Sequence, residues 1–186
     1  MDGVERRMFP QSRHWVCSRA RGRTLELGVG RGATLKHYGA DIDLTGLDWS
    51  GAMLALARGR AAEAACTVTL EQGDASALAF ADDSFDTVVS TFALCCIPDE
   101  HAALREAVRV LRPGGRLLLA DHVASSRWWL RALQRAADAV SVPLHGEHFS
   151  RRPAVLLPAL GVTIEMTERH RAGIIEHVHA TVPVSR

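Results

Sequence analysis

Three glycines at alternate positions follow an acidic residue near the start of the chain. They are Gly28, Gly30 and Gly32, and Glu26 lies two residues before the first of them. Glycines are needed where a turn requires unusual backbone angles, or where a side chain would keep a ligand from touching the backbone. A carboxylate beside such a turn suits a ligand with positive charge better than one with a pyrophosphate group.

A second acidic residue, Asp48, follows at about the distance expected of a ribose-binding acid. Gly28, Gly30 and Ala33 also fit the fingerprint of dinucleotide-binding proteins, so NAD remains an alternative ligand. A tight turn without any ligand is the third interpretation. Glu26 favours S-adenosylmethionine, which joins an adenosine to a sulfonium and an ammonium group.

A third acidic residue, Asp74, follows the next apolar run. Its carboxylate could accept a hydrogen bond from an adenine amino group, although such a residue, taken alone, is more often part of a turn. Together with Glu26, it favours S-adenosylmethionine over NAD, whereas Asp48 would hold an adenosine ribose in either ligand.

The elements that must position these residues alternate between strand and helix over the first two thirds of the chain. Ser50 and Asp99 are typical N-caps of two of the helices. The alternation predicts an α/β fold with a parallel sheet and helices on both faces. The predicted strands are 24–28, 43–48, 67–71, 85–91 and 116–121, the predicted helices are 33–38, 52–65 and 99–112, and Pro113-Gly114-Gly115 is predicted to turn into the fifth strand.

The last third has a different pattern. A helix is predicted around Trp128 and Trp129, followed by a loop with Pro143, His145, Gly146 and His148 and by a short helix near 152–160. Two final strands, 162–168 and 174–182, are joined by a short polar turn and must therefore be antiparallel. The whole chain predicts a Rossmann-like seven-stranded sheet that is mostly parallel, with an antiparallel last strand.

The motifs between about residues 24 and 122 occur in the order typical of one family. The chain resembles class I S-adenosylmethionine-dependent methyltransferases of the methyltransferase type 11 group. Residues 91–99 and 120–123 look most similar to a branch that acts on thiols or on phosphatidylethanolamine. The motifs that carry the resemblance are Glu26–Gly32, Gly46–Ser50, Gly73–Ala75, Asp83–Asp86 and Leu111–Gly115.

The resemblance implies a role for each matching position. The backbone of residues 28–32 would line the methionine portion of the donor, with Glu26 near its ammonium group. Asp48 would hold the ribose hydroxyls, and Thr91, Phe92 and Ala93 would shape the methyl-bearing end. Trp49 and Met53 would flank the adenine or belong to the core. The donor-binding residues expected in this way are Glu26, Gly28, Val29, Gly30, Gly32, Asp48, Trp49, Met53, Asp74, Ala75, Thr91 and Phe92.

Histidines are the candidates for chemistry on the acceptor. His122 follows the fifth strand at the edge where ligands bind in this architecture, so it is the candidate catalytic residue. His145 and His148 could fold over the acceptor. For each of the three alone, a surface or hydrogen-bonded residue is the favoured interpretation, and an amine or thiolate acceptor needs no strong base.

Two further groups have simpler interpretations. His177 and His179 alternate along the last strand and share a face, where a metal ion is the less favoured interpretation. Cys95 and Cys96 are expected to be packed thiols, with a nucleophilic or metalloid-binding role as the alternative. We therefore expect no metal site.

Composition limits the remaining possibilities. The chain has 186 residues and a formal charge of +1, which predicts a single domain without general affinity for nucleic acid. We divide it into an N-terminal helix or lid (1–22), a cofactor-binding half (23–122) and an acceptor-side half with a C-terminal hairpin (123–186). Four cysteines without metal-site spacing, and no signal peptide or membrane-spanning run, predict a cytoplasmic protein with reduced thiols.

The sequence thus predicts a methyltransferase acting on a small-molecule or lipid acceptor through an amine, thiol or hydroxyl group. A non-catalytic S-adenosylmethionine-binding module and, less favoured, an NAD-dependent oxidoreductase are the alternatives. We expect a monomer or homodimer, with no transmembrane segment. The basic N-terminal segment either touches anionic lipid or is a solvated end.

Overall fold

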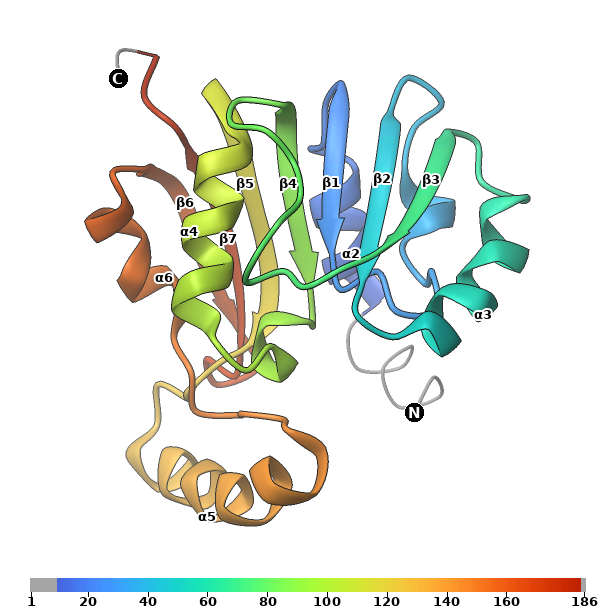
Figure 1. Cartoon of the computed structure of the whole chain (residues 1–186). Coiled ribbons are helices and arrows are strands. Elements are labelled where there is room, and N and C mark those ends of the chain that lie inside the picture. The colour runs from blue at the N-terminus through green and yellow to red at the C-terminus, as the bar shows by residue number, and fades with distance from the viewer. Residues whose placement is uncertain (1–9, 185–186) are drawn as a thin grey trace.

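One seven-stranded sheet forms the centre of the computed structural model, which describes residues 10–184 (Figure 1). The strands lie in the order β3-β2-β1-β4-β5-β7-β6. β7 is antiparallel to both of its neighbours, and the other strand pairs are parallel. The predicted Rossmann-like sheet is thus confirmed. The strands are β1 (Arg23–Leu27), β2 (Asp43–Asp48), β3 (Thr67–Gln72), β4 (Phe85–Thr91), β5 (Leu111–His122), β6 (Thr163–His170) and β7 (Ile175–Thr181).

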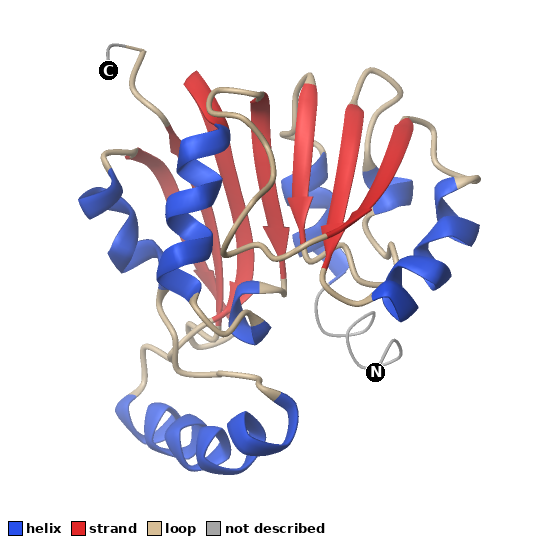
Figure 2. Cartoon of the chain, viewed as in Figure 1, coloured by secondary structure: helices blue, strands red, loops and turns tan. Residues whose placement is uncertain are grey.

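Helices cover both faces of the sheet, as Figure 2 shows. α4, α6 and η3 pack on one apolar face, whereas α2, η1 and α3 pack on the other. α2 lies within the predicted N-terminal helix or lid, of which residues 1–9 are outside the described residues. The helices are α2 (Pro10–Cys17), α3 (Gly51–Ala61), α4 (Glu100–Val110), α5 (Trp128–His145) and α6 (Pro153–Leu156), with the 3-10 turns η1 (Leu35–His37), η2 (Leu94–Cys96) and η3 (Leu157–Leu160).

The order of the strands reverses between β1 and β4. From β1 the chain proceeds outward through β2 to β3, and then returns to the other side of β1 as β4. In the sheet, Leu27 lies beside Leu47 and beside Ser90. The segments that follow these three strands therefore leave the sheet at one edge. In open α/β sheets, ligands bind at such a reversal, outside the carboxyl ends of the strands.

The predicted helix over 33–38 is wrong, because only the short turn η1 forms there. Thr34 could have capped a helix, but its hydroxyl donates to Glu26 and makes no cap hydrogen bond. The glycines of the preceding loop have positive φ angles, the last of them at Gly32, and Gly39 follows closely. Too few residues remain between these glycines for an α-helix to become stable.

The start of β5 also differs from the prediction. Pro113-Gly114-Gly115 was expected to form a turn, but α4 ends at Val110 and the strand already begins at Leu111. The pairing between β4 and β5 is irregular at this point, and Gly114 has a φ of 78°. The segment also bonds to the end of the chain, since Gly114 N–H donates to the Val182 carbonyl at 2.9 Å. These residues therefore form a bulged strand.

The predicted loop around Pro143 and His145 is part of α5. Pro143 lies inside this helix, where it costs one backbone hydrogen bond, and Gly146 closes the helix with a φ of 70°. α5 stands apart from the layers, below the edge toward which the strands β1–β5 point (Figure 1). Within the described range 10–184, no helix is both long enough and apolar enough to cross a membrane.

Candidate active site at the carboxyl edge of the sheet

The glycine loop after β1 packs closely against the segment after β4. Gly28 and Gly30 have φ angles of 68° and 54°, in the left-handed region that favours glycine. A Cβ atom at Gly28 would overlap the Cβ of Ala93, whereas one at Gly30 would meet nothing closer than a carbonyl at 4.0 Å. The Val29 side chain is buried in the core. The loop therefore offers its backbone, and open space at Gly30, to a ligand.

Asp48 connects this loop to the end of β2. One carboxylate oxygen accepts a hydrogen bond from Gly30 N–H at 2.8 Å, and the other accepts one from Ser50 N–H at 2.9 Å. A carboxylate oxygen has a second lone pair, so both remain able to accept a hydroxyl group. The predicted ribose-binding residue thus also fixes the shape of the glycine loop.

Trp49 and Met53 lie at the surface beside Asp48. The side chain of Trp49 is 82% exposed and that of Met53 is 39% exposed, so the alternative that both belong to the core is wrong. The Trp49 carbonyl accepts a hydrogen bond from the Gln72 side chain at 2.9 Å, which connects it to β3. A large exposed apolar surface is therefore present where the adenine was expected.

The loop that carries Asp74 meets the end of β2, because Gly73 N–H donates to the Asp48 carbonyl at 3.1 Å. Asp74 is exposed, and one of its oxygens accepts a hydrogen bond from Ser76 N–H at 2.8 Å, as in a turn. Ala75 is buried in the core. The structure thus brings the loops after β2 and β3 together.

Glu26, which was expected near the ammonium group of the donor, lies inside the protein. Its side chain is buried, and one carboxylate oxygen accepts hydrogen bonds from the hydroxyls of Thr34 at 2.9 Å and Tyr38 at 3.1 Å. Burial raises the pKa of Glu26 to about 7, against the opposing effect of these two bonds. The carboxyl group therefore lies among buried hydroxyls, without direct exposure. Thr34 and Tyr38 were not anticipated, because nothing in the sequence marks them as its partners.

The backbone after β4 is strained at Phe92. Its φ is 54°, which is unfavourable for a bulky residue, and its N–H donates to the Ala120 carbonyl at 2.8 Å. Thr91 beside it is buried. Such strain persists where surrounding contacts enforce it, and it is concentrated at functional sites. The predicted methyl-side segment is thus held in one shape by β5.

His122, the predicted catalytic residue, is the last residue of β5 and half-buried. Its ring lies 4.8 Å from the ring of Phe92 and 6.4 Å from the ring of Phe149, measured between centroids. The guanidinium of Arg13, on α2, lies 5.8 Å from the Phe92 ring centroid. Phe149 and Arg13 join the site from distant parts of the chain, and sequence reasoning missed both.

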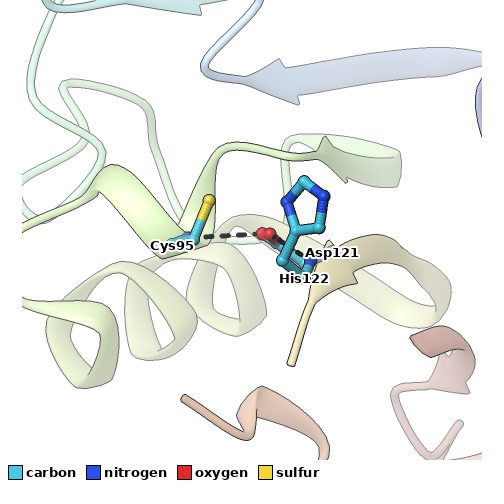
Figure 3. A group of neighbouring side chains, drawn as sticks. All are labelled: Cys95, Asp121 and His122. Atoms are coloured by element: carbon cyan, nitrogen blue, oxygen red, sulfur yellow. Dashed lines mark hydrogen bonds between the residues drawn. The ribbon is translucent and has the colours of Figure 1, made fainter. Parts of the chain in front are cut away.

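Asp121, beside His122, is a further residue that the sequence did not single out (Figure 3). Its carboxylate is buried and accepts hydrogen bonds from the backbone N–H groups of Cys95 at 3.3 Å and His122 at 2.7 Å. Burial raises its pKa to about 6. Asp121 therefore ties the turn η2 to the end of β5. Cys95, Asp121 and His122 each place one potential metal-ligand atom within 4.8 Å of the others.

Cys95 and Cys96 lie side by side as free thiols, with their sulfur atoms 3.8 Å apart. The hydrogen bond with Cys96, together with burial, raises the pKa of Cys95, and the same bond lowers the pKa of Cys96. Cys95 is a packed thiol as predicted, but Cys96 is exposed, so the prediction is wrong for the second of the pair.

Three other histidines lie in different surroundings. His148 N–H donates to the Cys95 carbonyl at 2.8 Å, near the site, whereas His145 is exposed at the end of α5. His177 packs against α2, since its ring stacks on Trp15 at 4.8 Å and bonds to the Ser12 hydroxyl at 2.8 Å. Burial lowers the pKa of His177 to about 4. His148 is thus bonded to the turn η2, whereas the side chain of His177 is occupied by α2.

Comparison with known proteins assigns the chain that carries this site to a family. The profile of the methyltransferase domain family matches residues 25–119, which include the glycine loop and β5 up to its last three residues. The chain belongs to this methyltransferase family. The resemblance to class I S-adenosylmethionine-dependent methyltransferases that the sequence motifs predicted is thereby confirmed.

Individual relatives agree with this assignment. The chain is 38% identical over 117 residues to a phosphatidylethanolamine N-methyltransferase of Cereibacter sphaeroides, covering 62% of this chain and 58% of that relative. It is 37% identical over 161 residues to a demethylmenaquinone methyltransferase of Mycolicibacterium paratuberculosis, covering 75% and 69%. The chain thus spans little more than half the length of the first relative.

The fold agrees as well. The crystal structure of an S-adenosylmethionine-dependent methyltransferase from Methanosarcina mazei superimposes with a TM-score of 0.69 and 22% identity, covering 90% of this chain and 95% of that one. Family membership removes most of the support for the NAD-dependent oxidoreductase.

Proposed function

We propose that this chain transfers the methyl group of S-adenosylmethionine to a lipid acceptor at the carboxyl edge of the sheet, beside His122. Asp48 holds the glycine loop open at the point where the strand order reverses, so that a ribose acceptor and an unobstructed backbone lie together. The family assignment supports methyl transfer as the chemistry of this site.

The residues present fit the donor. Asp48 accepts the ribose hydroxyls with its second lone pairs, the exposed Trp49 ring covers one face of the adenine, and Gly30 leaves room for close approach of the methionine portion. The buried Glu26 acts through its charge from among the hydroxyls of Thr34 and Tyr38, and this charge favours a cationic ligand. When bound, S-adenosylmethionine would supply an activated methyl group, which passes in line to the nucleophile while the sulfur leaves as the neutral thioether of S-adenosylhomocysteine.

On the acceptor side, the protein aligns the nucleophile and receives its proton. His122 is held at the end of β5 by the bond from its backbone N–H to Asp121, and Phe92 and Phe149 flank its ring. The imidazole takes the proton that an amine or hydroxyl acceptor loses as its bond to the methyl carbon forms. The two aromatic rings exclude water from the reacting atoms.

The names of the relatives support a lipid acceptor. One is named for a phospholipid amine and the other for a quinone, and both kinds of molecule carry long apolar chains. Thiols and hydroxyls of small molecules are the less supported acceptors.

A labelled-methyl transfer assay tests the proposal. Purified protein is incubated with S-adenosylmethionine carrying a labelled methyl group and with phosphatidylethanolamine, a demethylated quinol or a small thiol, each in separate reactions. We expect label in one of the two lipids, and loss of this label in Asp48→Ala but not in Asp43→Ala, an exposed residue at the other end of β2. Donor binding without transfer to any acceptor would instead identify a non-catalytic binding module.

A further inference from the structure

The helix α5 presents its apolar side chains to solvent. Trp129, Leu133, Val140 and Leu144 are 46%, 59%, 60% and 69% exposed. Their spacing of four, seven and four residues places them in one stripe along the helix. Trp128 at the start of the helix is 77% exposed. In a water-soluble protein, such a stripe is normally packed against the core.

The opposite side of α5, which faces the protein, is polar. Gln134 is buried, accepts a hydrogen bond from Ser125 N–H at 2.7 Å, and donates to the carbonyls of Val123 at 2.9 Å and Phe149 at 3.0 Å. One turn further along, Asp138 accepts hydrogen bonds from Phe149 N–H at 2.6 Å and from the Ser150 hydroxyl. The helix is thus attached by its polar side, which leaves the apolar side outward.

Charge distinguishes between the possible partners of the apolar stripe. Arg127 and Arg135 are exposed and Arg131 is half-buried, whereas the one acidic residue of the helix is Asp138, whose carboxylate is occupied on the inner side. The apolar stripe is therefore bordered by exposed positive charge at Arg127 and Arg135. Trp128 lies beside the stripe rather than within it, because neighbouring residues of a helix point about 100° apart. This combination is typical of helices that lie in the interface of a bilayer containing anionic lipid.

The position of α5 connects this surface to the site. The helix lies below the carboxyl edge of the sheet (Figure 1), and its partner Phe149 is the residue whose ring flanks His122. We propose that the outer face of α5 docks the protein on the headgroup region of an anionic bilayer, so that a lipid acceptor reaches His122 from the membrane. The identity of the acceptor rests on the proposed function, but the docking itself does not.

Vesicle co-sedimentation tests the docking without any turnover. We expect the protein to bind vesicles of phosphatidylglycerol and phosphatidylcholine in equal parts more tightly than vesicles of phosphatidylcholine alone. The variant Leu133→Gln/Val140→Gln/Leu144→Gln should bind the mixed vesicles about tenfold more weakly or worse, because three apolar contacts are lost. Arg127→Gln/Arg135→Gln should bind them about fivefold more weakly for each arginine at low salt.

A matched control changes exposed apolar residues elsewhere. Leu56→Gln/Val155→Gln replaces side chains that are 56% and 60% exposed on α3 and α6, and should bind vesicles like the unaltered protein. Calorimetric affinity for S-adenosylhomocysteine should be the same in all variants, which shows that they fold.

Three results would overturn the docking proposal. The first is that the unaltered protein binds neither kind of vesicle, and the second is that the triple variant and the control bind mixed vesicles equally. The third is that light scattering detects a dimer that the triple variant loses while its vesicle binding is unchanged, because the stripe would then pack against a second copy. Vesicle binding without methyl transfer would refute only the proposed function.

Discussion

The loop after β1 and the helix α5 lie at the same edge of the sheet, but they are held in different ways. The loop is fixed by Asp48 and by its close packing against Ala93. α5 is attached through the polar side chains of Gln134 and Asp138, and it exposes apolar side chains. The first arrangement suits a donor whose geometry must be constant. The second suits an acceptor that arrives from a membrane. Substitutions on the donor side, at the loop, and on the acceptor side, near α5, should therefore have separable effects.

The largest expected effect is at Glu26, where stability and donor binding should change in opposite directions. Burial raises the pKa of this carboxyl from 4.5 to about 7, so the folded state holds the proton more tightly than the unfolded state. Stability therefore falls as the pH rises through this range, by up to about 3 kcal/mol. Glu26→Gln should be more stable than the unaltered protein at pH 8 and should bind S-adenosylhomocysteine less well.

Urea unfolding at several pH values measures this difference. Part of the pH dependence should remain in Glu26→Gln, because burial also raises the pKa of Asp121 to about 6. Glu71→Gln, at an exposed position of β3, is the control and should follow the unaltered protein. Equal stability of both proteins at pH 8 would contradict the cost assigned to the buried carboxylate.

His122→Phe should affect the acceptor side alone. The phenylalanine keeps the aromatic contact with Phe92 but cannot accept a proton, so kcat should fall about 100-fold for an acceptor that must lose one. Donor affinity should stay within about twofold. The pH profile of kcat separates this role from a structural one, since the limb set by the imidazole should disappear in the variant. An unchanged kcat would remove His122 from the proposed mechanism.

Gly28→Ala should affect the donor side alone. The new Cβ would overlap Ala93 and require a φ of 68°, so we expect a loss of stability of about 2 kcal/mol and about 30-fold weaker binding of S-adenosylhomocysteine. Gly59→Ala in α3 is the control, because a Cβ at this position meets nothing within 4 Å. It should instead raise the free energy of unfolding by about 0.5–1 kcal/mol. Ala93→Gly should restore part of the binding lost in Gly28→Ala. If it restores none, the backbone angle is responsible rather than the contact.

The smallest effect is expected at Gln134. Gln134→Ala removes three hydrogen bonds of a buried side chain and should cost about 1–2 kcal/mol, most of it local to α5. Hydrogen exchange should become faster between residues 123 and 150 while donor affinity is unchanged. Arg135→Ala, at the exposed neighbouring position, is the control. Weaker donor binding in Gln134→Ala would mean that the two sides are coupled.

The same contrast explains what could be predicted from the sequence. The seven strands, the cap of Asp99 on α4 and the position of Asp48 follow from local patterns, because each depends on residues close in the chain. The partners of Glu26 and the contact of Phe149 with His122 depend on how separate segments pack, which no local pattern records. The helical period of α5 was visible, but its outward orientation is decided by hydrogen bonds of Gln134.

The central claim is that the glycine loop and Asp48 bind S-adenosylmethionine. Calorimetric titration of the purified protein with S-adenosylhomocysteine and, separately, with NAD tests it most directly, with Asp48→Ala and Asp43→Ala as the variant and its control. We predict binding of S-adenosylhomocysteine alone, at least about 100-fold weaker in Asp48→Ala because two charged hydrogen bonds and the ribose contact are lost, and unchanged in Asp43→Ala. Tighter binding of NAD, or binding of neither ligand, would contradict it.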